Sequence, residues 1–370
     1  MKLLMISGDR SLTVGRKGAF WQTLEELRKH WERIDVLCPG TVCHSEKSVV
    51  QSDAAFPNVF LYPSPRGLWY QSLWILRKGK ELYGQHRYNV MTIHDYPPFY
   101  NGIGAWLLHR VTSIPSVTEI HHIVGDPVAA NVQEKMGQML YPLYFRTLGR
   151  SAAAFRVVNS SVRDRLSLFR VPKEKIHLVP SLYLDHELLQ PDPNIPKEYD
   201  IVFCGRLVAN KGVEELITVA AAMRPPPRLL IIGDGPLRHR LQTTNDKRQT
   251  HVTFTGWLPS SSDVYRAIQA AKIFVVCSKS EGGPRVLLEA MALGLPVITT
   301  SVGIVPDVIR DHENGLITTG TQEDLAAKIH LLLSDEAMRL GLGQRARDVL
   351  QRFERRKLIR EYAHFLQSFA

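Results

Sequence analysis

Short apolar runs alternate with amphipathic stretches along the whole chain. Six such runs occur in the first half: KLLMIS (2–7), RIDVLC (33–38), NVMTIH (89–94), SVTEIHH (116–122), AFRVVNS (154–160) and KIHLVP (175–180). Five more follow in the second half: IVFCG (201–205), RLLIIG (228–233), VTFTG (252–256), IFVVC (273–277) and PVITT (296–300). Short, fully apolar strands that alternate with helices predict parallel sheets covered by helices on both faces.

A proline-rich stretch, QPDPNIPKEYD (190–200), separates the two series of strands. Because each proline blocks regular pairing, this stretch is the natural linker. We therefore predict an α/β protein with two doubly wound, Rossmann-like domains over 1–188 and 189–352, facing a central cleft. Ligands of such sheets bind at the carboxyl ends of the strands. The apolar spacing of the last segment (345–370) predicts a helix, and the sequence leaves open whether residues 353–370 cross back to the first domain.

Composition narrows the class of protein. The chain has 370 residues, 44% hydrophobic and 22% charged, without the ~18–20-residue apolar run of a membrane helix. The start, MKLLMISGDR, is too short in apolar residues for a signal peptide. The four cysteines form no CxxC pair, as expected of reduced thiols in a cytoplasmic protein. The net charge of +10 lies mostly in residues 1–190, which favours an anionic partner such as phosphate, nucleic acid or an acidic membrane.

Two acids flank a glycine-rich helix start in EGGPRVLLE (281–289). Proline favours the first helical position, so we expect a helix from about Pro284, with Glu281 before it and Glu289 inside it. Eight helical residues span ~12 Å, roughly the length of a sugar diphosphate from ribose to hexose. Glu289 can then accept the ribose hydroxyls while Glu281 reaches the hexose. The alternative is two unrelated acids, one in a helix start and one on a helix face.

Two cations lie between a strand and a helix in GRLVANKGVEEL (205–216). Together with backbone N–H groups at the helix start, Arg206 and Lys211 suit a diphosphate. The alternative is a pair of solvated loop cations. The next strand ends in IIGDGPL, where Gly233 and Gly235 indicate a tight turn more often than a phosphate-binding loop.

These motifs carry a resemblance. GRLVANKG, IIGDGPLR, FTGWLP and SEGGPRVLLEAMALGLPVITTSVGIVPDVI resemble, in this order and spacing, the C-terminal half of the retaining GT-B glycosyltransferases of family 4. The resemblance is strong over about 200–320, where EGGPRVLLE fits the E-x7-E signature. The first half is similar more loosely, in GRKGAF, IPSVTEIHH and VVNSSVRDRL.

The resemblance implies a metal-independent enzyme without a cofactor. It would move a hexose, with retention of configuration, from a UDP- or GDP-linked sugar to a hydroxyl acceptor in glycan, polysaccharide or glycolipid synthesis. The chain contains no Asp-x-Asp, the pattern by which metal-dependent glycosyltransferases of the other major fold hold their cation. In the usual same-face mechanism the leaving phosphate oxygen removes the acceptor's proton.

The resemblance also implies roles for individual residues. Glu281 would position the transferred sugar and His121 would lie beside it, with His122 as the alternative. On the donor, Arg206 and Lys211 would bind the diphosphate and Glu289 the ribose. The main chain near Gly283 and Arg285 would bind phosphate and sugar, and the main chain near Leu258 would bind the base. Gly15 or Gly18 would allow close approach from the first domain.

Two departures from the family pattern affect the site. Gly283-Pro284 stands where the family often has phenylalanine and glycine, and SLYLD (181–185) replaces asparagine-glycine-valine-aspartate. The fine sugar contacts and the interdomain contacts are therefore expected to differ. His94-Asp95 looks like a catalytic pair, but no nucleophile accompanies it, which favours a structural or acceptor-loop role.

The acceptor is expected to be a glycan, a lipid-linked molecule or a small molecule. Aromatic and basic residues mix in GLWYQSLWILRKGKELYGQHRY (67–88) and KMGQMLYPLYFRTLGR (135–150). Such stretches can dock on an anionic bilayer, here the inner face of the membrane, or can form core helices with a solvated face.

Three other functions are alternatives to a glycosyltransferase. A nucleotide-sugar epimerase of the same fold would act without an acceptor. An α-glucan phosphorylase would need a lysine for pyridoxal phosphate and a far longer chain. A non-catalytic polyanion-binding protein would explain the charge but not the ordered acids, cations and glycines, and no nucleic-acid-binding module is recognisable, so no nucleic acid is expected.

Overall fold

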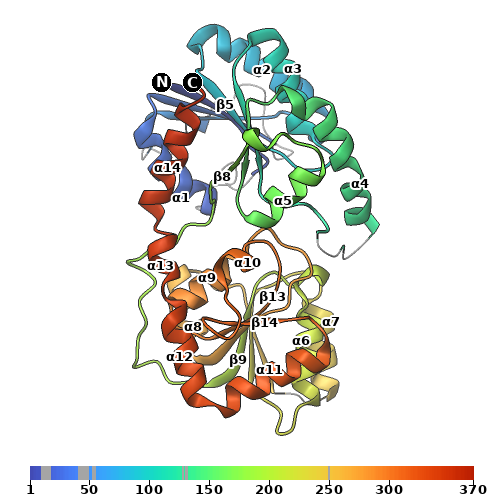
Figure 1. The fold of residues 1–370 in the computed structure, drawn as a ribbon, viewed down its shortest axis with the longest axis vertical. Helices are drawn as coiled ribbons and strands as arrows, with labels where there is room; N and C mark the ends of the chain where they lie inside the picture. Colours follow the sequence, from blue (N-terminus) through green and yellow to red (C-terminus); the bar gives the residue numbers. More distant parts are fainter. Residues whose placement is uncertain (10–17, 41–49, 52–55, 127–128, 130–131, 249–250) are drawn as a thin grey trace. The chain divides into compact units, whose positions relative to one another are not determined.

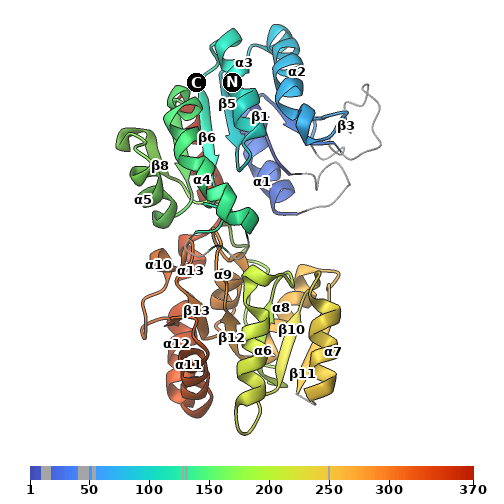
Figure 2. The ribbon, with the colours of Figure 1, turned by 90° about the vertical axis from the view of Figure 1, so that its right-hand side faces the viewer.

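The computed structural model describes residues 1–9, 18–40, 50–51, 56–126, 129, 132–248 and 251–370. The chain divides into two compact units (Figure 1). Unit 1 comprises Met1–Val124, Met136–Ser181 and Arg355–Ala370, and unit 2 comprises Gly125–Lys135 and Leu182–Glu354. Each unit is a sheet with helices on both faces, as Figure 2 also shows.

Unit 1 contains a sheet of order β3-β4-β2-β1-β5-β6-β7-β8. Every neighbouring pair is parallel except β3 and β4, which pair antiparallel at the edge. The strands are β1 (Lys2–Ile6), β2 (Arg33–Cys38), β3 (Val50–Gln51), β4 (Val59–Pro63), β5 (Val90–His94), β6 (Ser116–Ile120), β7 (Ala154–Val157) and β8 (Ile176–Leu178).

The helices with this sheet are α1 (Ala19–Leu27), α2 (Gln71–His86), α3 (Tyr100–Thr112), α4 (Val132–Arg146, whose first turn belongs to unit 2), α5 (Ser160–Leu168) and α14 (Arg355–Gln367). Helices α2 and α3 pack closely because α2 carries a glycine at the contact. A Cβ on Gly79 would lie 2.5 Å from Leu108 Cδ2. Helices α1 and α14 lie side by side, although they come from opposite ends of the chain (Figure 1).

Unit 2 contains a six-stranded sheet of order β11-β10-β9-β12-β13-β14, parallel throughout. The strands are β9 (Tyr199–Cys204), β10 (Leu229–Ile232), β11 (Val252–Gly256), β12 (Ala271–Val276), β13 (Val297–Thr300) and β14 (Leu316–Thr318). The strand order runs outward from β9 to β11 and then reverses to begin again at β12. The loops that follow β9 and β12 therefore diverge at the position where open α/β sheets bind their ligands.

The α-helices that the structure describes with this sheet are α6 (Val213–Ala222), α7 (Arg238–Arg248), α8 (Ser261–Gln269), α9 (Arg285–Ala292), α10 (Val305–Val308), α11 (Gln322–Ser334), α12 (Glu336–Ala346) and α13 (Val349–Arg352). Helices α6 and α11 share one buried apolar core with strands β9, β10 and β12. This burial of apolar side chains is the main force that holds the helices on the sheet and so fixes the loops at its edge.

The prediction of two Rossmann-like sheets is confirmed, and the apolar runs of the sequence coincide with strands in both. Three strands, β3, β4 and β14, have no counterpart among those runs. The segment 345–370 is helical, as the apolar spacing predicts, but it is not one uninterrupted helix. The chain breaks between α12, α13 and α14, and Leu184 N donates to Phe353 O at 2.7 Å in the second break, which an uninterrupted helix would not allow.

The units divide between Ser181 and Leu182, seven residues before the predicted boundary. The proline-rich stretch 190–200 is fastened to unit 2, because Asp192 N donates to Gln269 Oε1 at 2.7 Å and Lys197 Nζ donates to Gln269 O at 2.6 Å. Helix α14 belongs to unit 1.

Two expectations about the whole chain concern cysteines and membranes. Cys38, Cys204 and Cys277 are free thiols, and Cys43 lies outside the described residues. Among the helices that the structure describes, none combines the length and the apolar character needed to cross a bilayer.

Candidate active site

The candidate donor-binding residues of the sequence meet at one edge of the unit 2 sheet. Arg206 follows β9, Lys211 ends the short 3₁₀ helix η6 (Ala209–Lys211), Leu258 follows β11 and Glu281 follows β12. Parallel strands end at the same edge, and β9 lies directly beside β12. The loops that carry Lys211 and Glu281 therefore flank the point where the strand order reverses.

Two hydrogen bonds join these two loops. Lys279 N donates to Asn210 O at 2.8 Å, and Asn210 Nδ2 donates to Ser280 O at 3.2 Å. Gly212 has a positive φ of 66°, and a Cβ there would lie 2.1 Å from Cys277 O. Only glycine fits such a close approach, so the sequence GRLVANKG places Lys211 over the end of β12.

Lys211 and Glu281 form an ion pair in which Lys211 Nζ donates to Glu281 Oε1. Their side chains are only 19% and 16% exposed. The second carboxylate oxygen, Glu281 Oε2, is buried and has no hydrogen-bond partner within the described residues. Buried carboxylate oxygens are normally satisfied, so this one is poised to accept a hydrogen bond from a ligand.

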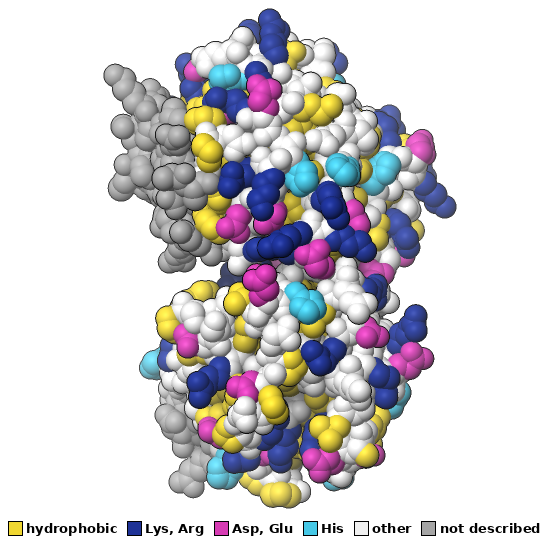
Figure 3. All heavy atoms as spheres, turned by 90° about the vertical axis from the view of Figure 1, so that its left-hand side faces the viewer, with side chains coloured by type: hydrophobic (Ala, Val, Ile, Leu, Met, Phe, Trp, Pro, Cys, Tyr) yellow, Lys and Arg dark blue, Asp and Glu magenta, His cyan; other side chains and the backbone are white. Residues whose placement is uncertain are grey.

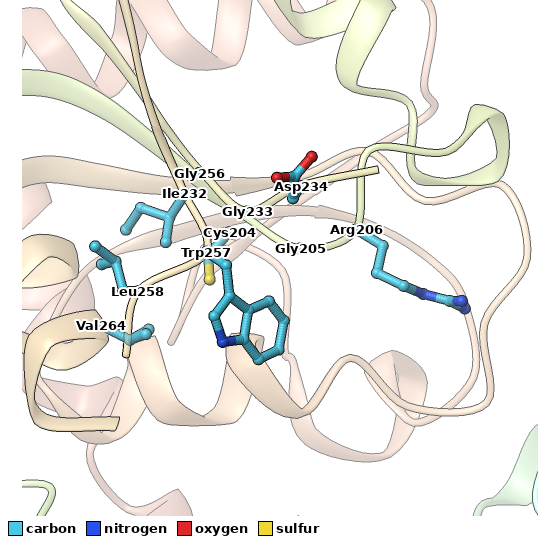
Figure 4. Close-up of a pocket in the computed structure, with 10 residues that line it drawn as sticks. All are labelled: Cys204, Gly205, Arg206, Ile232, Gly233, Asp234, Gly256, Trp257, Leu258 and Val264. Carbon is cyan, nitrogen blue, oxygen red and sulfur yellow. The ribbon is translucent and has the colours of Figure 1, made fainter. Parts of the chain in front are cut away.

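Arg206 is the second cation of this edge. Its side chain is exposed and makes no hydrogen bond or ion pair with any described residue. Figure 4 shows it extending away from the apolar residues Ile232, Leu258 and Val264. An unpaired guanidinium in a loop fixed by two strands offers planar, two-pronged donors to a phosphate.

Glu289 lies inside helix α9, whose N-cap is Pro284, one residue before the first helical residue. The Oε1 atom of Glu289 accepts from Tyr265 Oη at 3.0 Å and from Arg285 Nε at 3.0 Å. Burial raises the pKa of Glu289, and the charge of Arg285 and the bond from Tyr265 oppose that rise. The carboxylate is thus held in one orientation on α9.

A cavity of about 170 Å³ is lined by two of the candidate donor-binding residues, Arg206 and Leu258 (Figure 4). Trp257, directly after β11, is 79% exposed although it lines this cavity. A large exposed ring at the mouth of an apolar cavity is suited to stack on a flat ligand. The lining residues are Cys204, Gly205, Arg206, Ile232, Gly233, Asp234, Gly256, Trp257, Leu258 and Val264.

The two departures from the family pattern meet in the structure. A Cβ on Gly283 would lie 2.7 Å from Leu182 Cδ1, and Leu182 belongs to the stretch SLYLD. Leu182 thus packs where a side chain at position 283 would begin. A larger residue at 283 would require Leu182 to move, so the two departures are coupled.

In unit 1, His121 follows directly after β6, and its Nε2 atom lies 3.3 Å from Glu119 Oε2. The ring of His94, at the end of β5, stacks on the ring of His121 with a centroid separation of 4.3 Å. Burial and the neighbouring His121 lower the pKa of His94 to about 3, so His94 is neutral. His122 is more exposed than His121 and offers its carbonyl oxygen to Tyr141 Oη at 3.4 Å.

The remaining candidates are glycines. Gly18 is the N-cap of α1, and its carbonyl oxygen accepts from Gln22 N at 3.1 Å. Gly15 lies outside the described residues. In the described ranges, no three His, Cys, Asp or Glu side chains gather as metal ligands do. The expectation of a metal-independent site stays a prediction.

Three contributors to these sites were missed from sequence. Tyr265 holds Glu289 from helix α8, and Glu119 holds His121. Tyr265 has no local signal, because it acts from a separate helix. Glu119 has one, because it precedes His121 by two residues and side chains two apart in an extended chain point to the same side. Trp257 did have a signal, since an aromatic residue directly after a strand-ending glycine, as in FTGWLP, is typical of an exposed loop side chain.

Comparisons with known proteins identify the family. A family model described as Glycosyltransferase Family 4 matches residues 20–181, and one described as Glycosyl transferases group 1 matches residues 185–349. The sulfoquinovosyl transferase SQD2 of Arabidopsis thaliana is 32% identical over 283 residues, which are 72% of this chain and 54% of that protein. The putative teichuronic acid biosynthesis glycosyltransferase TuaC of Bacillus subtilis is 37% identical over 244 residues, 64% of this chain and 60% of TuaC.

The chain thus spans little more than half the length of these relatives. Among solved structures, Anabaena Alr3699/HepE resembles the chain over its whole length in complexes with UDP (TM-score 0.78, 18% identity) and with UDP-glucose (TM-score 0.75, 17% identity). Both structures cover 100% of each chain. One family model matches each half of the chain, and the chain has two Rossmann-like sheets, as its structural neighbours do. The chain therefore belongs to the family 4 glycosyltransferases of the GT-B fold.

Proposed function

We propose that this protein moves a hexose from a nucleotide diphosphate sugar to a hydroxyl acceptor, with retention of anomeric configuration and without a metal. One observation carries the proposal: Lys211 and Glu281 pair across the switch point of the unit 2 sheet while Arg206 and Glu281 Oε2 are left without partners in the described part of the chain. Two cations and an unsatisfied acid at such a point match an anionic donor that carries sugar hydroxyls.

The diphosphate is assigned to Arg206 and Lys211. Cleavage of the bond between the sugar and the phosphate places negative charge on the leaving phosphate oxygen. Positive groups that are fixed beforehand stabilise this charge as it forms, and the start of helix α9 adds its dipole. These three sources supply the charge that a divalent cation provides in other transferases.

The nucleoside is assigned to Glu289 and the adjoining cavity. A carboxylate held by Tyr265 and Arg285 is a rigid acceptor for ribose hydroxyls, which donate hydrogen bonds. Trp257 would stack on the base, and the main chain near Leu258 would bond its edge. The UDP complexes of HepE support uridine as the first base to test, with guanosine as the alternative.

Glu281 is assigned to the transferred sugar, with Oε2 accepting a hydroxyl. In the proposed same-face reaction the acceptor oxygen bonds to the anomeric carbon as the bond to the phosphate oxygen breaks. The acceptor's proton passes to that leaving oxygen, so no side-chain base is needed. The family resemblance assigns His121 to the sugar as well. Gly18 keeps its proposed role of close approach to the diphosphate, and the main chain near Gly283 and Arg285 its role at phosphate and sugar.

We assign the acceptor to the membrane: it would be reached while the protein is docked on anionic lipids at the inner face of the cell membrane. Helix α4 buries Tyr141, Tyr144 and Phe145 in unit 1, yet its other side is also apolar and exposed. That side carries Val132, Met136, Met139, Leu140 and Leu143, with exposed Lys135, Arg146 and Arg150 nearby. An exposed apolar stripe beside basic residues is typical of helices that dock on anionic lipids.

A polyanion-binding role is favoured less. On the face that Figure 3 shows, Lys and Arg side chains are interspersed with Asp and Glu rather than gathered into one basic patch. A lipid-linked or membrane-proximal glycan acceptor is therefore the first to test. Met139→Glu should abolish binding to vesicles that contain phosphatidylserine, whereas Leu340→Glu, at another exposed apolar residue, on α12, should not. No vesicle binding by the native protein at low salt would remove the membrane from the proposal.

The reaction itself is tested in two steps. UDP-, GDP- and ADP-sugars are first screened for an increase in melting temperature, because a ligand that binds only the folded state stabilises it. The sugar that gives the largest shift is then incubated with the protein, and the released sugar or product is followed by proton NMR. Appearance of the α product from an α donor supports retention. Epimerised donor without transfer, or no turnover of any sugar, would overturn the proposal.

A further inference from the structure

A second set of ionisable groups lies inside unit 1, around the buried carboxylate of Glu119 on β6. Four side chains donate to it. On Oε1 the donors are Thr92 Oγ1 and Tyr362 Oη, the latter at 2.5 Å. On Oε2 they are Arg156 Nη1 at 2.7 Å and His121 Nε2 at 3.3 Å. Both oxygens are thus fully used, and one of their partners is the histidine assigned to the transferred sugar.

Arg156 makes this carboxylate an anion of fixed orientation. The guanidinium also donates to Val179 O at 3.0 Å and Pro180 O at 2.6 Å, and its carbon lies 3.7 Å from the centre of the Tyr362 ring. Burial acts to raise the pKa of Glu119, but Arg156 and the bond from His121 outweigh burial and hold it well below its ordinary value. Glu119 therefore acts only as an acceptor toward His121.

The imidazole ring of His121 is held in two ways, by a hydrogen bond at its edge and by a stacked ring on its face. Residues two apart in an extended chain point to the same side, which brings His121 over Glu119. The bond to Glu119 engages Nε2, and the ring of His94 covers one face at 4.3 Å. Nδ1 has no partner among the residues that the structure describes, and the side chain is 32% exposed. Nδ1 is the nitrogen left for a ligand.

Tyr362 connects the C-terminal helix, α14, to the hydrogen-bond network around Glu119. Helix α14 is seated on unit 1 by Arg355 Nη1, 3.6 Å from Glu25 Oε2, and by Gln367 Nε2, which donates to His30 O at 2.9 Å. Between these two ends, the Tyr362 hydroxyl points into the sheet and reaches Glu119. The last helix of the chain is thus coupled to the imidazole through one carboxylate.

We propose that Glu119 and Tyr362 are positioning residues for His121: they fix its Nε2–H tautomer and so present Nδ1 as a hydrogen-bond acceptor for a hydroxyl of the transferred sugar. This inference rests on the proposed function, which assigns His121 to that sugar. A neutral imidazole exists as two tautomers, and the partner of one nitrogen decides which is present. Without the acceptor at Nε2, part of the population would carry its proton on Nδ1 and could not accept from the sugar.

The first arm of the test needs no substrate. Nitrogen-15 NMR of ligand-free protein reports which nitrogen of His121 carries the proton, with assignment by loss of the signals in His121→Ala. Native protein should show the Nε2–H form. Removing Glu119 alone would leave Arg156 buried without its partner, so Glu119→Met is combined with Arg156→Met, because replacing both members of a buried ion pair is often neutral for stability. This double variant should populate the Nδ1–H form.

The second arm measures turnover. The double variant should lose roughly 10- to 100-fold in kcat with donor KM within about threefold, because a hydrogen bond of the transition state is lost while donor binding is kept. Tyr362→Phe keeps the ring under Arg156 and should lower kcat roughly threefold to tenfold. Tyr83→Phe, a partly buried tyrosine of α2, is the matched control and should change neither value.

A third comparison identifies the nitrogen that matters. An Asn side chain places its amide where Nδ1 lies, and a Gln side chain places it where Nε2 lies. His121→Asn should therefore keep more activity than His121→Gln. The reverse order would contradict the proposal.

The outcomes separate this inference from the proposed function. An unchanged tautomer in the double variant would overturn the positioning role, whatever the enzyme transfers. A changed tautomer with unchanged kcat would also overturn it, and would leave the transferase function standing. If native protein transferred no sugar, the proposed function would fail, and the tautomer would still decide whether Glu119 orients the ring.

Discussion

Each unit of this protein contains a lysine or arginine paired with a glutamate, within the sheet in unit 1 and at the carboxyl edge of the sheet in unit 2. The two glutamates differ in how fully they are hydrogen-bonded. In unit 1, Glu119 accepts from four donors and its partner Arg156 makes two further bonds to carbonyl oxygens. In unit 2, Glu281 accepts only from Lys211, and its second oxygen is buried without a partner in the described chain.

The difference distinguishes a scaffold from a binding site. A buried charge that is fully hydrogen-bonded stabilises one arrangement of the surrounding elements and leaves nothing for a ligand. A buried charge that is half satisfied is costly unless a ligand completes it. The donor edge of unit 2 is therefore incomplete by itself, and the network of unit 1 is complete.

The largest effect should follow from breaking the complete pair. Arg156→Met leaves Glu119 as a buried anion without its cation, and we expect a loss of about 3–5 kcal/mol in the free energy of unfolding. Urea denaturation measures it. Arg163→Met, which removes an exposed arginine paired with Asp164, should cost no more than about 0.5 kcal/mol. Equal losses in the two variants would show that the network carries no special stability.

Breaking the incomplete pair should affect turnover rather than folding. Glu281→Gln should lower kcat roughly 100- to 1,000-fold, the range for loss of a fixed polar group that meets the reacting centre. Its melting temperature should stay within a few degrees of that of the native protein. Glu313→Gln, at an exposed surface pair, is the control and should keep full turnover. A drop in stability without a drop in kcat would place Glu281 with the scaffold.

Asp95 extends the comparison to a buried acid with no cation at all. Both of its oxygens are buried, and burial raises its pKa to about 7, although bonds from the Tyr144 hydroxyl and from the backbone N–H groups of Gly102 and Tyr96 act to lower it. Ionisation is therefore disfavoured in the folded state, and this cost grows as the pH rises from about 4 to 7 and then stays constant.

Asp95→Asn removes that cost. The variant should be more stable than the native protein at pH 8, by up to about 4 kcal/mol, and should lose this advantage at pH 4, where the unfolded chain also binds the proton. Thermal unfolding at the two pH values measures the difference. A gain of the same size at both pH values would mean that the charge of Asp95 is not the cause.

A smaller effect is expected from the cation without a partner. Arg206→Ala should weaken UDP binding roughly 10- to 100-fold, as expected for lost hydrogen bonds to a charged phosphate. Isothermal titration at two salt concentrations measures this. Arg240→Ala, which removes an arginine of α7 that pairs with Glu214, should bind UDP like the native protein. Equal affinities for all three proteins would remove Arg206 from the site.

The smallest effect should come from chelation. If Arg206, Lys211 and the start of α9 supply the positive charge at the diphosphate, EDTA should change the transfer rate by less than about twofold. Loss of activity with EDTA, restored by Mg²⁺ or Mn²⁺, would instead require a cation in the reaction.

The sequence predicts the frame of the molecule better than its contacts. Apolar runs of five to seven residues locate most strands of both sheets, whereas β4 and β14 have no counterpart among those runs. The break before α14 depends on a bond from Leu184, which no local pattern reveals.

The same limit applies to the sites. Arg206, Lys211, Glu281 and Glu289 could be grouped from sequence because parallel strands end at a common edge. The network around Glu119 could not, because Tyr362 lies 243 residues further along the chain. Thr92 and Arg156 reach Glu119 from the neighbouring strands β5 and β7, but Tyr362 reaches it only through the packing of α14 on unit 1, which is a property of the folded chain.

The most direct test of the central claim is a crystal structure with a bound nucleotide sugar, grown with the donor that raises the melting temperature most. The account predicts the diphosphate within hydrogen-bond distance of Arg206 and Lys211, the ribose hydroxyls on Glu289 and a sugar hydroxyl on Glu281 Oε2. A nucleotide bound elsewhere, with those four side chains turned away from it and Glu281 still unsatisfied, would contradict it.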